Sequence, residues 1–432
     1  MIEPAPAALA GLRVVELAHE RIAFAGKLLA DMGACVIVVE PPRGAAGRWL
    51  PPFVNDEVDP ERSLNWWHYN TSKLGVTLDI DDERGRDALR KLVATADFFI
   101  ESEDPGRLAA LSLAPGDLEE VKPDLITISM TPFGSSGPRC DEPATDLTIL
   151  AGGGPAWMCG YDDHTLPPVR GGGNQGYHTG CHFAVMSGLT ALLVRDATGV
   201  GQHIDVNMHA AANVTTEAGS YAWLVSGDTM QRQTGRHASS GATMESQIQC
   251  RDGRYANTGV PPRQPKEFAA VAGWVRALGL EEEFPEVFLL EMGGQREFID
   301  LTMIGKDEEV TAIFGAGRDA MNLIASKLPA YEFFAQGQER GIPLGVIYSP
   351  EEVMSDPHFE DRGFPVVVDH EELGEVVYPG APYKFGETPW RIQRRAPRLG
   401  EHNAVVLRDL GLDEREIADL AGTAPGTEPA AR

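Results

Sequence analysis

Short apolar runs alternate with helical patterns along the first two hundred residues of this 432-residue chain. In chain order, these strand and helix candidates are residues 12–17, 22–32, 35–39, 83–95, 97–100 and 125–130. Strands separated by helices are joined by crossover connections, which are right-handed and generate a parallel sheet covered by helices on both faces. The sequence therefore predicts a doubly wound α/β fold.

The alternation does not continue through the whole chain. A long apolar stretch at Cys181–Val194 predicts a buried helix, whereas residues 228–341 contain polar loops and shorter helical patterns. A strand signal returns at Gly345–Tyr348, where we expect the chain to re-enter the first domain. A chain of this length is expected to form more than one domain. We predict a discontinuous large domain of residues 1–215 and 345–432, and linkers with a smaller α+β domain at 216–344.

Charge and hydropathy exclude several classes of partner. Asp and Glu outnumber Lys and Arg by 64 to 37, giving a formal net charge of -27, and nucleic-acid binding requires clustered cations. No run of eighteen apolar residues predicts a membrane span, and the N-terminal segment lacks the pattern of a signal peptide. The five cysteines are scattered without a CxxC pair, as is typical of reduced cytosolic proteins. We expect a cytoplasmic protein that binds neither nucleic acid nor membrane.

Common cofactor and metal motifs are missing. The glycine clusters Gly152–Gly154 and Gly171–Gly173 match neither the GxGxxG fingerprint nor a P-loop, which argues against nicotinamide cofactors and nucleoside triphosphates. A GxSxG nucleophile motif is also absent. His178 and His182 are spaced to share a helical face, but no third ligand is near, so we interpret them as core or pocket-lining residues. We predict no metal site and no permanently bound cofactor.

Five segments carry a resemblance to one known family. In chain order, they are Gly11–Glu40, Asn70-x-x-Lys73 with Val76-Thr-Leu-Asp79, Thr131–Pro138, Arg195-x-x-Thr198-Gly199-x-Gly201-Gln202 with Asp205-Val206, and Ala396–Leu412. Together they resemble the family III CoA-transferases, which include formyl-CoA and carnitine CoA-transferases and related acyl-CoA racemases. The resemblance implies a Rossmann-like large domain, a small domain and an interlocked dimer.

The resemblance also implies a chemistry, with a coenzyme A thioester as substrate. In this family an aspartate attacks the donor thioester, forms a mixed anhydride and then carries CoA as an aspartyl thioester. Such covalent catalysis keeps the acyl group activated while water is excluded.

The sequence departs from the family at the nucleophile. The resemblance places the catalytic aspartate four residues before Gly180, and this chain has Gly176 there. No Asp or Glu occurs between Asp163 and Asp196, so a shifted alignment does not restore the carboxylate. A racemase needs a His–Asp pair for proton transfer, and this chain has Thr145-Asp146 instead, which argues against racemization.

The turn that contacts the nucleotide of CoA in the family also differs. It reads Glu101-Ser-Glu-Asp-Pro-Gly106, and the additional carboxylates of Glu103 and Asp104 would repel CoA phosphates. The glycine-rich loop of some members is reduced to Gly259. These departures indicate a subunit that has lost its own chemistry.

Three functions remain open. The leading hypothesis is a subunit without the nucleophile in a heteromeric CoA-transferase, paired with a paralogue that carries the aspartate. The segment Trp157–Gly173 resembles the benzylsuccinate CoA-transferases of anaerobic toluene degradation, a branch with unequal subunits, which implies succinyl-CoA as donor and an aromatic-substituted succinate as acceptor. One alternative is a self-sufficient transferase that uses Asp146 as a displaced nucleophile, and another is a non-catalytic binding or scaffold protein.

Candidate CoA-binding residues come from two sources. The loop after the first strand opens at the carboxyl end of the sheet, where ligands enter such folds, and a nearby arginine can bind phosphate; other positions carry over from the family's N-x-x-K stretch. The candidates are His19, Glu20, Arg21, Arg43, Asn70, Lys73 and Leu78. The alternatives are a surface ion pair for the loop residues and a solvated charge for Lys73. Arg195 and Asp205 are expected to tie the long helix to the strand that follows it.

Overall fold

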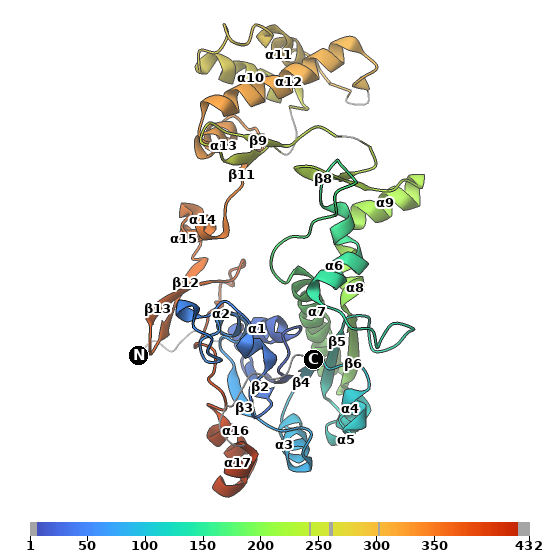
Figure 1. Cartoon of the computed structure of the whole chain (residues 1–432), viewed down its shortest axis with the longest axis vertical. Coiled ribbons are helices and arrows are strands. Elements are labelled where there is room, and N and C mark those ends of the chain that lie inside the picture. The colour runs from blue at the N-terminus through green and yellow to red at the C-terminus, as the bar shows by residue number, and fades with distance from the viewer. Residues whose placement is uncertain (1–6, 242, 259–261, 301–302, 422–432) are drawn as a thin grey trace. The chain divides into compact units, whose positions relative to one another are not determined.

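A computed structural model describes residues 7–241, 243–258, 262–300 and 303–421 (Figure 1). Gly259 lies outside these ranges. The chain divides into two compact units, which are described separately. The first contains residues up to 156, residues 170–217 and residues from 354 onward, and the second contains residues 157–169 and 218–353.

The first unit is built on six parallel strands in the order β3-β2-β1-β4-β5-β6. Their bounds are β1 Arg13–Leu17, β2 Cys35–Glu40, β3 Leu74–Thr77, β4 Phe98–Glu101, β5 Ile126–Thr131 and β6 Gln202–Asn207. This confirms the predicted doubly wound sheet. The strand order reverses between β1 and β4, so the loops after these two strands diverge and leave a crevice at their carboxyl ends.

Helices cover both faces of this sheet. In chain order the helices of the first unit are α1 Ala23–Asp31, α2 Leu64–Tyr69, α3 Glu83–Val93, α4 Arg107–Ala110, α5 Pro115–Val121, α6 Asp146–Gly153, α7 Gln175–Thr198, α8 Met208–Val214, α15 Pro357–Asp361, α16 Asn403–Asp409 and α17 Glu414–Ala421. Successive residues of a strand point to opposite faces of the sheet. Val14 and Phe98 therefore join the core beneath α1 and α7, whereas Val15 and Phe99 join the core beneath α3, α16 and α17.

The α7 helix is longer than the apolar pattern predicted. It runs from Gln175 to Thr198 and ends at Gly199, whose φ of 75° is a left-handed conformation that favours glycine. The apolar pattern identified the middle of the helix at Cys181–Val194. Its first turn is polar and glycine-containing, and a residue distant in sequence caps it, as described below.

The second unit has its own core, centred on Phe268, Trp274 and Phe333. Its elements are α9 Glu217–Ser226, β7 Gln231–Gln233, β8 Arg236–Ser239, β9 Gln247–Gln249, β10 Tyr255–Asn257, α10 Pro265–Ala277, α11 Val287–Gly294, α12 Glu308–Lys327, α13 Ala330–Glu339, β11 Gly345–Val346 and α14 Pro350–Met354. A three-stranded sheet has the order β11-β10-β9 and antiparallel pairing.

The expected point of return to the large domain was wrong. The strand signal at Gly345–Tyr348 corresponds to β11, which pairs with β10 inside the second unit. The chain rejoins the first unit near residue 354, and a hairpin of β12 Pro365–His370 and β13 Gly374–Pro379 follows. Residues 157–169 also belong to the second unit. A strand as short as β11 carries no pattern that identifies its partner, so the sequence could not assign it to a sheet.

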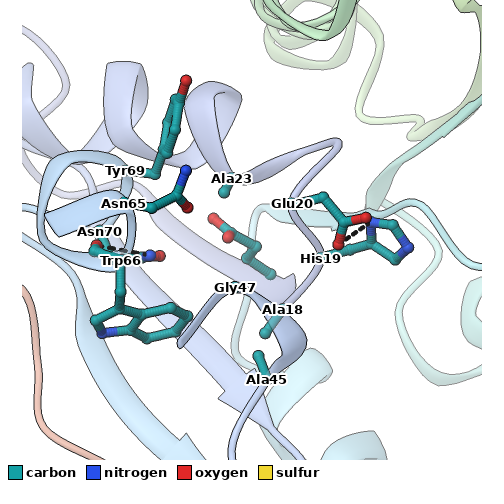
Figure 2. Close-up of a pocket in the computed structure, with 11 residues that line it drawn as sticks. Ala18, His19, Glu20, Ala23, Ala45, Gly47, Asn65, Trp66, Tyr69 and Asn70 are labelled. Atoms are coloured by element: carbon teal, nitrogen blue, oxygen red, sulfur yellow. Dashed lines mark hydrogen bonds and ion pairs between the residues drawn. The ribbon is translucent and has the colours of Figure 1, made fainter. Parts of the chain in front are cut away.

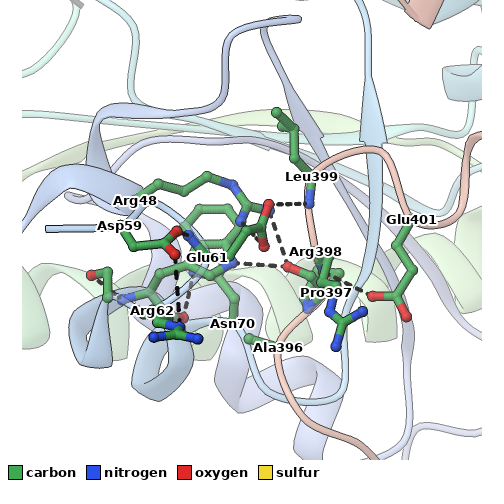
Figure 3. A network of polar contacts seen from close by, with 12 residues as sticks. Arg48, Asp59, Glu61, Arg62, Asn70, Ala396, Pro397, Arg398, Leu399 and Glu401 are labelled. Carbon is green, nitrogen blue, oxygen red and sulfur yellow. Dashed lines mark hydrogen bonds and ion pairs between the residues drawn. The ribbon is translucent and has the colours of Figure 1, made fainter. Parts of the chain in front are cut away.

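A buried network joins the C-terminal segment to the N-terminal part of the first unit (Figure 3). Arg48, which is 0% exposed, donates to both carboxylate oxygens of Glu40 at 2.6 and 2.8 Å and to the carbonyl oxygen of Pro397 at 3.0 Å. The indole of Trp66 donates to the same carbonyl at 3.0 Å. This pairing holds the closing segment, recognized in the sequence as 396–412, against β2.

We predict that Arg48→Met destabilizes the first unit by about 3–5 kcal/mol, because Glu40 would remain buried without its partner. Urea unfolding monitored by tryptophan fluorescence measures this loss. Arg43→Met is the matched control, since Arg43 is exposed and surface substitutions change stability by about 0.5 kcal/mol or less. Equal midpoints for the two variants would contradict the prediction.

Candidate functional site

A pocket opens at the carboxyl end of β1, beside the loop that the sequence predicted to bind CoA (Figure 2). It is lined by Glu16, Ala18, His19, Glu20, Ala23, Ala45, Gly47, Asn65, Trp66, Tyr69 and Asn70. His19 Nδ1 lies 3.4 Å from a carboxylate oxygen of Glu20 and accepts a hydrogen bond from the N–H of Arg21, and burial lowers the pKa of His19. Three of the predicted residues, His19, Glu20 and Asn70, therefore line one pocket.

Lys73 lies behind this pocket and is 0% exposed. Its ammonium donates to Glu16 Oε1 at 2.8 Å, to the carbonyl of Ala23 at 2.9 Å and to Asn70 Oδ1 at 2.9 Å. All three donors of the ammonium are thus engaged. The alternative of a solvated charge is wrong, because the side chain is inside the fold, where it bonds to three residues of the pocket wall.

Glu16 is the buried partner of Lys73. Burial raises its pKa to about 7, while Lys73 lowers it. Its Oε2 atom has no hydrogen-bond partner among the protein atoms, and a Cβ at Gly26 would lie 1.6 Å from that oxygen. Glycine at position 26 therefore makes the room that this carboxylate needs.

The structure does not bring the other three candidates into the lining of the pocket. Arg21 faces Asp104 on the turn after β4. Leu78 is 1% exposed and packs in the core beneath α3. Arg43 is exposed on the loop after β2 and does not line the pocket. All three stay predictions as CoA-binding residues.

Position 176, where the resemblance places the nucleophile, lies in the first turn of α7. The backbone N–H groups of Gly176 and Tyr177 both donate to Asp146 Oδ1, at 2.8 and 3.1 Å. Arg170 donates to Asp146 Oδ2 at 3.1 Å. The carboxylate thus satisfies amides at the start of a 24-residue helix, where the helix dipole favours negative charge.

This contact also limits what position 176 can hold. A Cβ at Gly176 would lie 3.1 Å from Asp146 Oδ1 and 3.0 Å from Ile149 Cγ2. A second carboxylate beginning there would stand against the first, and two carboxylates at such a distance cannot both ionize freely. The Asp146 side chain is only 8% exposed, and both of its oxygens accept hydrogen bonds from the protein.

Near this turn, the two histidines of α7 lie beside aromatic rings. Phe24 stacks on His178 with 4.2 Å between ring centroids and meets His182 edge-on at 5.6 Å. The hydroxyl of Tyr69, which lines the pocket, lies 2.8 Å from His178 Nε2. Burial lowers the pKa of His178. Within the described ranges, no group of three or more His, Cys, Asp or Glu residues is arranged to hold a metal.

The acidic turn after β4 forms the other side of the crevice. Glu103 pairs with Arg107 at 3.0 Å, and Asp104, whose side chain is 85% exposed, lies 3.6 Å from Arg21 on the loop after β1. Burial raises the pKa of Glu101 to about 7, and its carboxylate accepts a hydrogen bond from the N–H of Glu103. Each of the two additional carboxylates therefore has a cationic neighbour.

Arg195 and Asp205 make structural contacts, but not the predicted ones. Arg195 bonds to Asp97 at 2.8 Å, which ties α7 to the turn before β4. Asp205 accepts hydrogen bonds from the N–H and hydroxyl of Ser135, which ties β6 to the glycine turn after β5. The expected link between α7 and β6 was wrong, because adjacency in sequence does not reveal these pairings.

Sequence reasoning missed Tyr69 and Arg170. Tyr69 directly precedes the N-x-x-K stretch, so its place in the pocket could have been found by extending that motif. Arg170 comes from an irregular segment that bonds to Asp146 across 24 residues. No spacing rule connects those positions.

The fold places the protein in the class of doubly wound α/β proteins. Its ligand crevice lies at the β1/β4 switch point, and a second, smaller unit is joined to the doubly wound domain. The model of one family, described as CoA-transferase family III, matches residues 9–403. The chain belongs to this family. The relatives that match this chain along nearly its whole length include several CoA-transferases, enzymes that take CoA thioesters as substrates.

Individual relatives agree with this assignment. Succinyl-CoA:(R)-benzylsuccinate CoA-transferase subunit BbsE of Thauera aromatica is 32% identical over 94% of this chain and 95% of that protein. Succinate–glutarate CoA-transferase of Agrobacterium fabrum is 29% identical over 94% of this chain and 96% of that protein. The crystal structure of a CAIB/BAIF family protein from Brucella suis covers 94% of this chain and 100% of that chain, with 26% identity and a TM-score of 0.75.

Across the part of the chain that the structure describes, no helix is both long and apolar enough to span a membrane.

We predict that Asp146→Ala lowers the free energy of unfolding by about 1–3 kcal/mol, because two amides at the start of α7 and the guanidinium of Arg170 lose their acceptor. Asp146→Asn should cost less, since an amide oxygen still accepts from the two N–H groups. Chemical denaturation measures both. A loss for Asn as large as that for Ala would mean that charge, and not capping, dominates.

We predict a pH-dependent effect at Glu101. Because its pKa is raised in the folded state, the protonated form contributes stability that is lost as the pH rises from about 4.5 through 7. Glu101→Gln keeps an acceptor for the N–H of Glu103 and cannot ionize. The stability of the variant relative to the native chain should therefore increase by about 1–3 kcal/mol between pH 5 and pH 8. Urea denaturation at both pH values tests this, and parallel behaviour of the two proteins would contradict it.

Proposed function

We propose that this chain is the subunit without a nucleophile in a heteromeric CoA-transferase that takes succinyl-CoA as donor. A paralogous subunit supplies the catalytic aspartate, and the acceptor is an aromatic-substituted succinate. The observation that carries the proposal is Gly176 in the first turn of α7. At that place the chain offers backbone amides that are already bonded to Asp146.

The similarity to known proteins supports the choice of substrate. The relative from Thauera aromatica is described as one subunit of an enzyme that uses succinyl-CoA and (R)-benzylsuccinate. The relative from Agrobacterium fabrum is described as acting on succinate and glutarate. Dicarboxylic acids are therefore the substrate class that we assign to the assembled enzyme.

Surface composition supports a partner subunit. On α7, Met186, Leu193 and Val194 are 56, 72 and 45% exposed. Apolar residues gathered on one helix are typical of a surface that another protein covers. We assign the interlocked assembly of the family to this chain, with the paralogue as its partner.

Asp146 supports a second candidate, a self-sufficient transferase. Its Oδ1 atom lies 3.1 Å from the place of a Cβ at position 176, so its carboxylate is close to where the family's nucleophile begins. Asp146 is nevertheless buried and engaged by Gly176, Tyr177 and Arg170. Burial limits access to this carboxylate and the charge-assisted hydrogen bonds lower its nucleophilicity, so these contacts favour the first proposal.

The two candidates differ in what the isolated chain does. We expect the chain purified alone to transfer CoA from succinyl-CoA to benzylsuccinate about a thousandfold or more below the rate of the complex, as loss of a covalent nucleophile typically causes. Co-expression with a paralogue that carries the aspartate should yield a stoichiometric complex with full activity. A scaffold protein would give neither the complex nor the gain in rate.

Asp146→Asn in the assembled complex tests the self-sufficient alternative. We expect transfer at the rate of the native complex once both preparations are shown to be folded. Full activity of the isolated native chain, abolished by Asp146→Asn, would instead establish Asp146 as the nucleophile.

A further inference from the structure

Arg21 lies at the switch point of the sheet with much of its hydrogen-bonding capacity unused. It follows β1, and its nearest carboxylate, Asp104, follows β4, so the two side chains face each other across the crevice between these strands. In doubly wound folds, ligands bind at this point. The Arg21 side chain is 12% exposed.

The guanidinium is weakly satisfied. Its Nε and Nη1 atoms are buried without a hydrogen-bond partner, and Nη2 makes one long bond of 3.5 Å to the carbonyl of Ala144. The distance of 3.6 Å to Asp104 allows an ion pair but exceeds a hydrogen bond. Buried donors without acceptors are costly, and arginines elsewhere in the first unit, such as Arg48, make several short bonds.

The backbone around Arg21 fixes its position against α7. The carbonyl of Arg21 accepts from Cys181 Sγ at 3.1 Å, and Ala144 lies two residues before Asp146. The guanidinium also acts on the buried phenol of Tyr177: burial raises the pKa of Tyr177, and Arg21 opposes that rise. Arg21 is therefore placed beside the turn that contains Gly176.

We propose that Arg21 binds the free carboxylate of the acyl group, the distal carboxylate of a succinyl thioester, and that Asp104 occupies this guanidinium when no ligand is present. This inference rests on the proposed function for the identity of the acyl group. It assigns to Arg21 a specificity role and not contact with CoA phosphates.

The geometry and charge of the crevice support a carboxylate. A guanidinium presents adjacent N–H donors that match the two oxygens of a carboxylate. Asp104 lies beside the guanidinium and Glu20 precedes Arg21 in the chain, so a doubly charged phosphate would meet more repulsion than a singly charged carboxylate. Asp104 already demonstrates that a carboxylate reaches this guanidinium, and its high exposure lets it move aside.

Two thioesters distinguish the acyl carboxylate from the CoA moiety. Succinyl-CoA and butyryl-CoA share a four-carbon acyl chain, but only the first has a free carboxylate. Titration calorimetry with the purified full-length chain should show that Arg21→Gln lowers the affinity for succinyl-CoA by about tenfold to a hundredfold, as expected for the loss of charge-assisted hydrogen bonds. Binding of butyryl-CoA should change by less than about twofold.

Companion variants separate charge from geometry. Asp104→Asn should raise the affinity for succinyl-CoA by about threefold, because a competing carboxylate is removed. Arg21→Lys should recover only part of the affinity, since an ammonium lacks the planar fork. Arg107→Gln is the matched control on the same crevice turn. Arg107 is already paired with Asp81 and Glu103, so its loss should leave the preference between the two thioesters unchanged.

The outcomes separate this inference from the proposed function. Equal weakening of both thioesters by Arg21→Gln would place a CoA phosphate at Arg21 and overturn the inference, while CoA binding would stand. Binding of both thioesters that is insensitive to Arg21 would also overturn it. If neither thioester binds, the thermal stability of the chain is measured with free succinate. Stabilization of the native chain that is lost in Arg21→Gln would support the carboxylate site and contradict the proposed function. The absence of any stabilization would contradict both.

Discussion

The contact between Asp146 and the first turn of α7 is the constraint on which the candidate site depends. One carboxylate accepts hydrogen bonds from Gly176 and Tyr177 and pairs with Arg170. It therefore fixes where α7 begins, holds α6 beside α7, and anchors the irregular segment that precedes α7. The amides of Gly176 and Tyr177 therefore face an internal carboxylate, and position 176 itself presents no side chain to a substrate.

Buried ion pairs hold the frame around this turn. Lys73 and Glu16 support the pocket from beneath, and Arg48 with Glu40 binds the C-terminal segment to β2. In both pairs the charges are enclosed and bonded several times, so removal of one partner is costly. Arg21 differs from these cations because its donors are largely unused. This contrast is the reason for which we propose that Arg21 binds a ligand.

The sequence predicted the sheet better than the site. Strands such as β1 and β2 are continuous apolar runs, and the helices between them require parallel crossovers, so the architecture follows from local pattern. The assignment of Gly345 to the large domain failed because the partner of a very short strand is set by tertiary packing. At the site, the motif found Asn70 and the loop position found His19, yet spacing could not reveal that Lys73 points inward. The bonds from Gly176 and Arg170 to Asp146 also join segments whose proximity no local pattern encodes.

The central claim is that the covalent step of CoA transfer takes place on a partner and not on this chain. The direct measurement is to trap the intermediate in the assembled complex. After incubation with succinyl-CoA, borohydride reduces an aspartyl thioester to an alcohol, and mass spectrometry of proteolytic peptides locates the modified residue. The account predicts modification of an aspartate of the partner subunit, with every Asp and Glu of this chain unmodified. Reduction at Asp146, or at any other carboxylate of this chain, would contradict it.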